Sequence, residues 1–118
     1  MNGREIISEL RQPTRDLRDS IPDTWAGFAQ LHREAVSDGV IPGHIKELMA
    51  VAIAVAEGCE GCIAYHARAA VHKGATEAEL SEALGVSLLM AGGPASVYAP
   101  KALDMFREFK EASLVSQT

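Results

Sequence analysis

The feature that most limits the fold of this chain is the apolar run at residues 48–56, which reads LMAVAIAVA. If the run is helical, apolar side chains surround the helix, and such a helix lies in a core or in an interface between subunits. A membrane-spanning helix needs about 20 apolar residues, so this run is too short to cross a bilayer. We therefore expect a helix from about His44 to Glu57 that is buried in the protein or between its subunits.

The rest of the sequence is typical of an all-α protein. No segment alternates apolar and polar residues over the length of a strand, and aromatic residues make up only 5% of the chain. Glycine, proline and capping residues instead divide it into five to six helices with short connections. The first helix is expected at about residues 4–10, with an interruption near Pro13. The second should begin at a cap, Ser20 or Asp23, and end at about residue 36. Four more helices are expected at about 44–57, 59–73, 77–91 and 94–112, followed by a frayed tail at 113–118.

Length and charge narrow the class of protein. A chain of 118 residues indicates a single domain, residues 1–118. The net charge of −5, with no basic cluster to offset it, argues against nucleic acid or a membrane as the partner, because both require a positive surface. The N-terminal residues MNGREIISELRQPTRDLRD are charged and lack the apolar segment of a signal peptide. We therefore expect a cytoplasmic protein, in a compartment where cysteine pairs more often serve catalysis or metal binding than cross-linking.

The only two cysteines follow directly after the apolar run. Cys59 and Cys62 lie in the stretch EGCEGCIAYH, which ends at His66. Each residue of a helix turns about 100°, so the three side chains share one narrow stripe. The imidazole lies one turn from the Cys62 thiol and can reach it directly or through a water molecule. Cys59 lies near the helix start, where free N–H groups and the helix dipole favour the reactive thiolate.

A fourth side chain, Glu47, is expected to reach the same place from the preceding helix. The break at Gly58 is short, so the two helices should be antiparallel. At a rise of about 1.5 Å per residue this arrangement brings Glu47 level with His66. A buried carboxylate there would orient the imidazole and raise its basicity. The alternative is that Glu47 is a solvated acid at the start of its helix.

The spacing leaves three interpretations of the cysteine pair: a redox-active dithiol, a metal site, or two buried structural thiols. The dithiol is favoured, because His66 lies far along the helix from Cys59 and no second cysteine or histidine pair completes a zinc site. The other histidines, His32, His44 and His72, have no thiol near them in the sequence and are interpreted as surface or core residues.

Three motifs together make the chain resemble the alkylhydroperoxidase D-like, carboxymuconolactone decarboxylase superfamily over about residues 36–110. The first is Glu47, twelve residues before the C-x-x-C-x-x-x-H motif that ends at His66. The second is the helix start Gly-Ala-Thr-x-x-Glu at 74–79, and the third is the Gly-Gly-Pro break at 92–94. The resemblance implies an all-α fold in which a helical hairpin carries the site, with the subunits assembled as a trimer or a hexamer.

The resemblance also implies a thiol-dependent hydroperoxide reductase, with Cys59 and Cys62 as catalytic thiols and Glu47 and His66 as a proton relay. We expect no bound cofactor or metal ion. An external dithiol, such as dihydrolipoamide or a thioredoxin-like protein, would reopen the disulfide. The sequence departs from the best-known peroxidases of the superfamily at Gly61, where they place a second histidine.

Two other functions remain as alternatives. The dithiol could pass electrons to a peroxiredoxin without any peroxidase activity of its own. The helices could also form an assembly module that holds a metal ion through Cys59, Cys62 and His66. The branch of the superfamily that decarboxylates a lactone lacks the cysteine pair, so that reaction is set aside.

Overall fold

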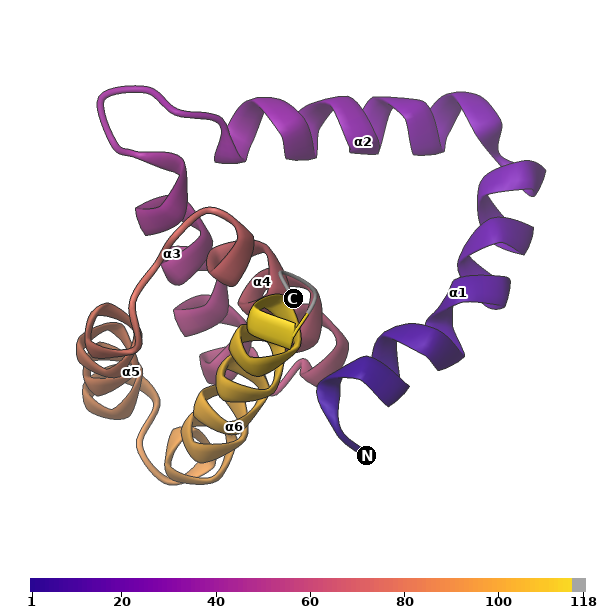
Figure 1. Ribbon diagram of the computed structural model, residues 1–118. Helices are drawn as coiled ribbons and strands as arrows, with labels where there is room; N and C mark the ends of the chain where they lie inside the picture. Colours follow the sequence, from indigo (N-terminus) through magenta and orange to yellow (C-terminus); the bar gives the residue numbers. More distant parts are fainter. Residues whose placement is uncertain (116–118) are drawn as a thin grey trace.

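The computed structural model describes residues 1–115, which form six α-helices and no strand, as the sequence predicts. Figure 1 shows a bundle made by the last four helices and an arm in which the first two helices project from it. The helices are α1 (Gly3–Ser20), α2 (Pro22–Val36), α3 (Gly43–Glu57), α4 (Glu60–His72), α5 (Glu77–Ala91) and α6 (Gly93–Val115). None of these described helices is long and apolar enough to span a membrane.

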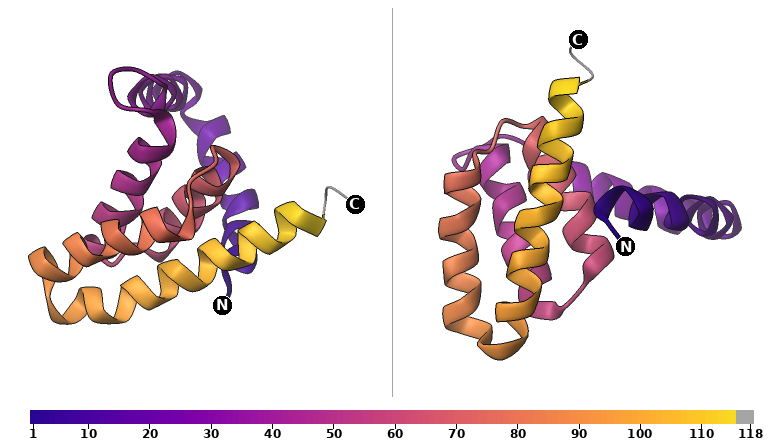
Figure 2. Two further views of the ribbon diagram at one scale, coloured as in Figure 1. Left: turned by 60° about the vertical axis from the view of Figure 1, so that its left-hand side comes forward. Right: turned by 60° about the horizontal axis from the view of Figure 1, so that its bottom comes forward.

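The bundle is held together by a core rich in small side chains. α3 packs on α4, α5 and α6, and α4 also packs on α6. Figure 2 shows α5 and α6 running side by side after the tight turn that joins them. Many of the buried residues are alanines, which allow helix axes to approach closely, while Ile63, Leu80 and Phe106 supply the largest buried apolar side chains. The buried hydroxyl of Ser87 donates to the backbone O of Ala52 at 2.9 Å.

The apolar run lies in α3, and the core covers one side of it. Leu48, Val51 and Val55 face the core with at most 3% of their surface exposed. Met49 and Ile53, on the other side of the helix, are 45% and 59% exposed. The expectation of a buried helix is therefore confirmed for one side of α3, and the predicted subunit interface would have to cover the other.

The turns of the bundle lie where the sequence predicts them. Gly58 (φ 70°) and Gly74 (φ 89°) follow α3 and α4 in a left-handed conformation, which glycine adopts without strain. Thr76 and Glu79 form the predicted capping box at the start of α5, where each side chain accepts a hydrogen bond from the other residue's backbone N–H. Pro94 lies in the first turn of α6, as expected.

The first helix of the arm differs from its prediction. An interruption is expected near Pro13, but α1 runs through Pro13 to Ser20 without a break. Proline lacks the N–H that would bond the carbonyl of Glu9. Both residues are exposed, so water can solvate that carbonyl and the helix continues.

The start of α1 is anchored to the bundle. Ile6 and Ile7 are buried in the core. Glu108 of α6 accepts hydrogen bonds from the backbone N–H groups of Gly3 and Arg4, at 2.8 and 3.1 Å. A carboxylate at this position satisfies two of the free donors of the helix start and is attracted by the helix dipole.

The start of α2 also differs from its prediction. Ser20 or Asp23 is expected to cap the helix, but the N-cap position is Ile21 and no side chain forms a capping hydrogen bond. Pro22 occupies the first helical position, where a helix has no use for the N–H that proline lacks. Ser20 instead donates to the backbone O of Asp16 in α1 at 2.9 Å. No residue of α2 is fully buried.

The last helix is longer than predicted. Its end is expected near residue 112, with a frayed tail beyond, but α6 continues to Val115. Ala112 and Ser113 are half-buried, so this last turn keeps some of its packing. Residues 116–118 of the predicted tail lie outside the described residues.

Candidate active site

The two cysteines form a disulfide at the turn between α3 and α4. At Gly58 the left-handed backbone and the ring of Tyr98, 3.2 Å from where a Cβ would lie, both favour glycine. Cys59 follows as the N-cap of α4, and its Sγ accepts a hydrogen bond from the backbone N–H of Cys62 at 3.2 Å. The two Cα atoms are 5.3 Å apart and the sulfurs are bonded. The disulfide that the family resemblance implies is therefore present in the structure.

The disulfide is accessible from outside the protein. Cys62 is exposed and Cys59 is half-buried. Reduction would place the Cys59 sulfur at the N-terminus of α4, where free N–H groups stabilise a thiolate. Such a pair can cycle between dithiol and disulfide by exchange with another thiol.

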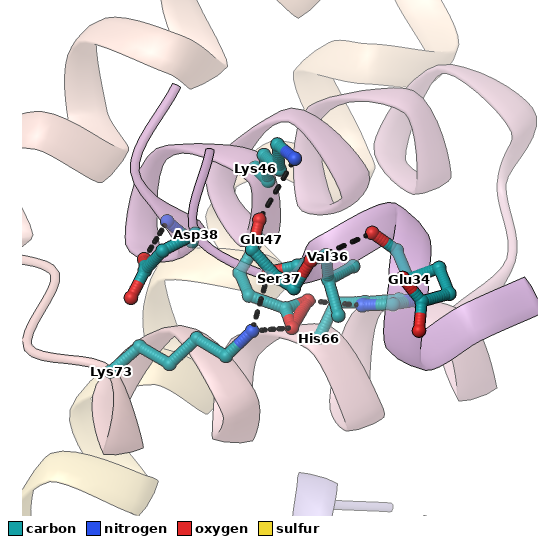
Figure 3. Close-up of polar contacts among 9 residues, drawn as sticks. Glu34, Val36, Ser37, Asp38, Lys46, Glu47, His66 and Lys73 are labelled. Atoms are coloured by element: carbon teal, nitrogen blue, oxygen red, sulfur yellow. Dashed lines mark hydrogen bonds and ion pairs between the residues drawn. The ribbon is translucent and has the colours of Figure 1, made fainter. Parts of the chain in front are cut away.

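A buried carboxylate holds the imidazole of the motif. Glu47 on α3 is 1% exposed, and its Oε1 lies 2.7 Å from Nδ1 of His66 on α4. Its Oε2 lies 3.4 Å from Nζ of Lys73. Figure 3 shows the carboxylate between these two basic side chains. The predicted contact of Glu47 with His66 is confirmed, and the alternative of a solvated Glu47 is wrong.

Glu47 is charged in the folded protein. Burial by itself raises the pKa of this carboxyl, but the hydrogen bond and charge of His66, together with those of Lys73, outweigh burial and bring the pKa below its usual value of 4.5. The carboxylate accepts the Nδ1 hydrogen bond of His66 and leaves Nε2 as the nitrogen that can take up a proton. The ring therefore has the tautomer that a general base needs.

Lys73 belongs to this group although the sequence prediction does not include it. It is the C-cap of α4, about two helical turns after His66, so helical spacing carried the signal. Its Nζ also donates to the backbone O of Val36, the last residue of α2, at 2.9 Å. Lys46 makes a similar hydrogen bond to the backbone O of Ser37 at 2.8 Å. Figure 3 shows how these two lysines fasten the end of α2 to the hairpin of α3 and α4.

The disulfide and His66 border a groove of about 1080 Å³ between the arm and α4. Gly61 borders it too, and a Cβ there would lie 3.2 Å from Cδ1 of Leu10, so α1 occupies the space beside this position. Apolar side chains supply most of the exposed surface of the groove. They include Ile6, Leu10, Trp25, Phe28, Ala29 and Ala69.

A second imidazole borders the same groove. The ring centroid of His32 on α2 lies 5.6 Å from that of His66. His32 is exposed, which agrees with its interpretation as a surface residue. That interpretation does not include the proximity to His66, because only the folding of the arm over α4 brings the two rings together. His72 also borders the groove, whereas His44 lies outside it and pairs with Glu79 at 3.4 Å.

The metal-holding alternative requires several donor side chains around one point. Within residues 1–115, no group of three or more histidine, cysteine, aspartate and glutamate side chains is placed in that way. The two sulfurs are bonded to each other, and Nδ1 of His66 faces Glu47.

Known proteins are similar to this chain in sequence over most of its length. The model of the carboxymuconolactone decarboxylase family matches residues 22–105. An uncharacterised protein of Cupriavidus necator is 36% identical over 100 residues, which cover 85% of this chain and 88% of that protein. An uncharacterised protein of the cox locus of Paracoccus denitrificans is 35% identical over 85 residues, 72% of this chain and 77% of that protein.

Solved structures share the fold. The apo form of a carboxymuconolactone decarboxylase family protein from Legionella pneumophila has a TM-score of 0.88 at 38% sequence identity, covering 92% of this chain and 96% of that chain. A family protein from Thermotoga maritima, for which involvement in the antioxidative response is suggested, has a TM-score of 0.81 at 24% identity and covers 97% of both chains. At that identity the likeness shows the fold alone.

Proposed function

This chain belongs to the carboxymuconolactone decarboxylase family, and we propose that it is a thiol-dependent hydroperoxide reductase that cycles between a dithiol and the Cys59–Cys62 disulfide. The observation that carries the proposal is an accessible cysteine pair one helical turn from an imidazole, His66, that a buried carboxylate holds. The antioxidative role suggested for the Thermotoga maritima protein agrees with an activity of this class.

The proposed cycle begins with the reduced protein. Nε2 of His66 takes the proton of Cys62, because Glu47 occupies Nδ1. The thiolate attacks one peroxide oxygen and the O–O bond breaks, which leaves a sulfenic acid on Cys62 and releases an alcohol once the departing oxygen is protonated. Cys59 then attacks the Cys62 sulfur, displaces water and closes the disulfide. An external dithiol reopens it by exchange.

Two features favour different cysteines as the first attacker. Helical spacing and exposure favour Cys62, whereas the N-cap position favours a thiolate on Cys59. We assign the attack to Cys62 because the base lies one turn away from it. A trapping reagent for sulfenic acid should then label the Cys59→Ser variant after peroxide treatment and leave Cys62→Ser unlabelled. Labelling of Cys62→Ser alone would reverse the order.

The experiment that tests the proposal follows the reduced protein, prepared without metal, after one equivalent of cumene hydroperoxide is added. We expect both thiols to disappear within seconds to minutes and the intact mass to fall by two hydrogens. The Cys59→Ser and Cys62→Ser variants should keep the fold and lose turnover. Thiols that survive the peroxide would exclude direct peroxidase chemistry, and stoichiometric zinc in protein purified without added metal would support the assembly module instead.

A second candidate function keeps the dithiol and removes the peroxide step. The protein would pass electrons between a reductase and a peroxiredoxin, and the exposure of Cys62 favours this role, since a protein thiol must reach the sulfur to form a mixed disulfide. Both functions need dihydrolipoamide or a thioredoxin-like dithiol as the donor. Peroxide consumption with dihydrolipoamide and no other protein would separate them, because only the peroxidase turns over.

A further inference from the structure

His32 of α2 borders the groove although its side chain is exposed. Trp25, Ala29 and Val36 mark the inward face of α2 by their partial burial, and His32 falls on the same stripe at helical spacing. Its ring lies 5.6 Å from that of His66 between centroids, with the planes inclined by 41°. Both rings border the groove that also contains the disulfide.

The same lysine that contacts the buried carboxylate fixes the position of α2. Lys73 contacts Glu47 at 3.4 Å and donates to the backbone O of Val36 at 2.9 Å, one helical turn beyond His32. Figure 3 shows this connection from α4 to the end of α2. A cation at the C-terminus of a helix is also favoured by the helix dipole. The lysine that pairs with Glu47 therefore also holds the end of α2, and with it His32, near the candidate site.

The two imidazoles are bound differently. His66 is held through Nδ1 by Glu47, whereas His32 makes no hydrogen bond or ion pair with any residue of the described range 1–115. Both nitrogens of His32 are thus open to water or to a molecule in the groove. The other residues with titratable or charged groups that border the groove are Met1 with the N-terminal amino group, Glu9 of α1, Arg33 of α2 and Glu60, Tyr65, Arg68 and His72 of α4.

We propose that His32 is a second catalytic imidazole, which protonates the departing oxygen of the hydroperoxide. The inference rests on the proposed peroxidase function and adds a residue from outside the cysteine motif. When the thiolate attacks the terminal oxygen of ROOH, a S–O bond forms, the O–O bond breaks, and the electron pair of that bond leaves on RO⁻. The imidazolium of His32 gives its proton to RO⁻, which departs as ROH, and His32 regains a proton from water. His66 takes the thiol proton and afterwards releases it to water, so the step consumes no net proton and each ring serves one proton transfer.

Two oxidants with different leaving groups test this role. tert-Butyl hydroperoxide releases an alkoxide that needs a proton, whereas peracetic acid releases acetate, which leaves without one. The His32→Gln variant should reduce tert-butyl hydroperoxide on the order of 10²-fold more slowly than the unchanged protein, at the lower end of what general acids contribute. Its rate with peracetic acid should be unchanged. Stopped-flow measurement of thiol loss in single turnovers gives both rates.

The matched control is His44→Gln, on α3 outside the groove, which should leave both rates unchanged. A His32→Ala variant supplies a second readout, because added imidazole should restore part of its lost rate with tert-butyl hydroperoxide. Equal slowing of both oxidants by His32→Gln would overturn the general-acid role, and so would normal rates with both. If neither compound oxidises the thiols of the unchanged protein, the proposed peroxidase function is wrong, and the inference about His32 is wrong with it.

Discussion

At the scale of single residues, Glu47 is a charge placed where water cannot reach it. Its side chain is 1% exposed, whereas its partners His66 and Lys73 are 22% and 35% exposed. A buried charge is tolerated when it is paired and hydrogen-bonded, and here both oxygens have a basic neighbour. The carboxylate is thus enclosed on α3, while the more exposed side chains that pair with it, His66 and Lys73, lie on α4 and at its C-cap.

This arrangement predicts a pH-dependent contribution to stability. The pKa of Glu47 is lower in the fold than in the unfolded chain, so its stabilisation is fully present above about pH 4.5 and is lost as the pH falls through the lower folded value. Glu47→Gln should therefore lower the free energy of unfolding at neutral pH by about 1–3 kcal/mol. The difference from the unchanged protein should shrink in acid, as measured by urea unfolding over a series of pH values.

Glu77→Gln is the control for that experiment. The pKa of Glu77 is also lowered, by its hydrogen bond to Arg107, but this pair is exposed to solvent. The substitution should change the unfolding free energy little at any pH. A Glu47→Gln deficit that is the same in acid as at neutral pH would contradict the assignment of a charged Glu47.

A residue of the candidate site can be predicted from the sequence when helical spacing or a short turn brings it to the site. Cys59, Cys62 and His66 lie on one stripe of one helix, and Glu47 follows from a tight antiparallel hairpin, so spacing alone places all four. Lys73 was also within reach of that reasoning. His32 was not, because its approach to the site depends on the path of a whole arm, which no local pattern encodes.

At the scale of elements, α2 is a helix with little packing of its own. None of its residues is fully buried, and an isolated helix of this length is marginal in water. Its end is fastened by the hydrogen bonds of Lys73 to the backbone O of Val36, the last residue of α2, and of Lys46 to the backbone O of Ser37, which follows it. The sequence predicts the helix from its apolar spacing, but it contains no signal for these long-range hydrogen bonds.

Removing one of these bonds should loosen α2 selectively. In the Lys73→Met variant, we expect faster amide hydrogen exchange in the last two turns of α2, and no change in α5, because stability varies locally within a fold. Hydrogen exchange followed by mass spectrometry resolves the two helices. Lys110→Met, an exposed lysine on α6, is the control and should exchange like the unchanged protein. Unaltered exchange in α2 of Lys73→Met would show that other contacts hold the helix.

The proline inside α1 gives a second prediction for an element. Replacement of Pro13 by alanine restores an N–H that can bond the carbonyl of Glu9 in an exposed part of the helix. Because proline costs a helix interior about 3 kcal/mol relative to alanine, Pro13→Ala should raise the thermal stability of α1, measured as a higher midpoint of the far-UV dichroism transition. A lower midpoint would indicate that the proline serves a contact that the helix alone does not explain.

At the scale of the whole molecule, large apolar side chains lie exposed on both parts of the structure. Phe28 and Leu31 of α2 are 58% and 64% exposed, and Leu89 and Met90 of α5 are 81% and 77% exposed. Surfaces of this kind mark sites of association when they are contiguous. We propose, as the family resemblance implies, that the chain forms a homo-oligomer, a trimer or a hexamer.

Light scattering coupled to size exclusion tests this assembly. At micromolar concentration the particle mass should be a multiple of the 12.6 kDa chain, and a monomer would contradict the proposal. Leu89→Glu should reduce the particle mass, since a charge would be buried in the interface. The matched control is Leu114→Glu, in the last turn of α6, where the leucine is 55% exposed. This substitution should leave the particle mass unchanged.

The disulfide closes a very small ring in the polypeptide chain. It joins residues only three apart, and closing so small a ring removes little freedom from an unfolded chain. The loop-entropy estimate is about 2 kcal/mol, less than half of what a bond across a hundred-residue loop would contribute. The ring can therefore open and close while the six helices stay packed. In the proposed cycle, the oxidation state of the sulfurs would follow the supply of electrons around the protein, at little cost to the scaffold that holds them.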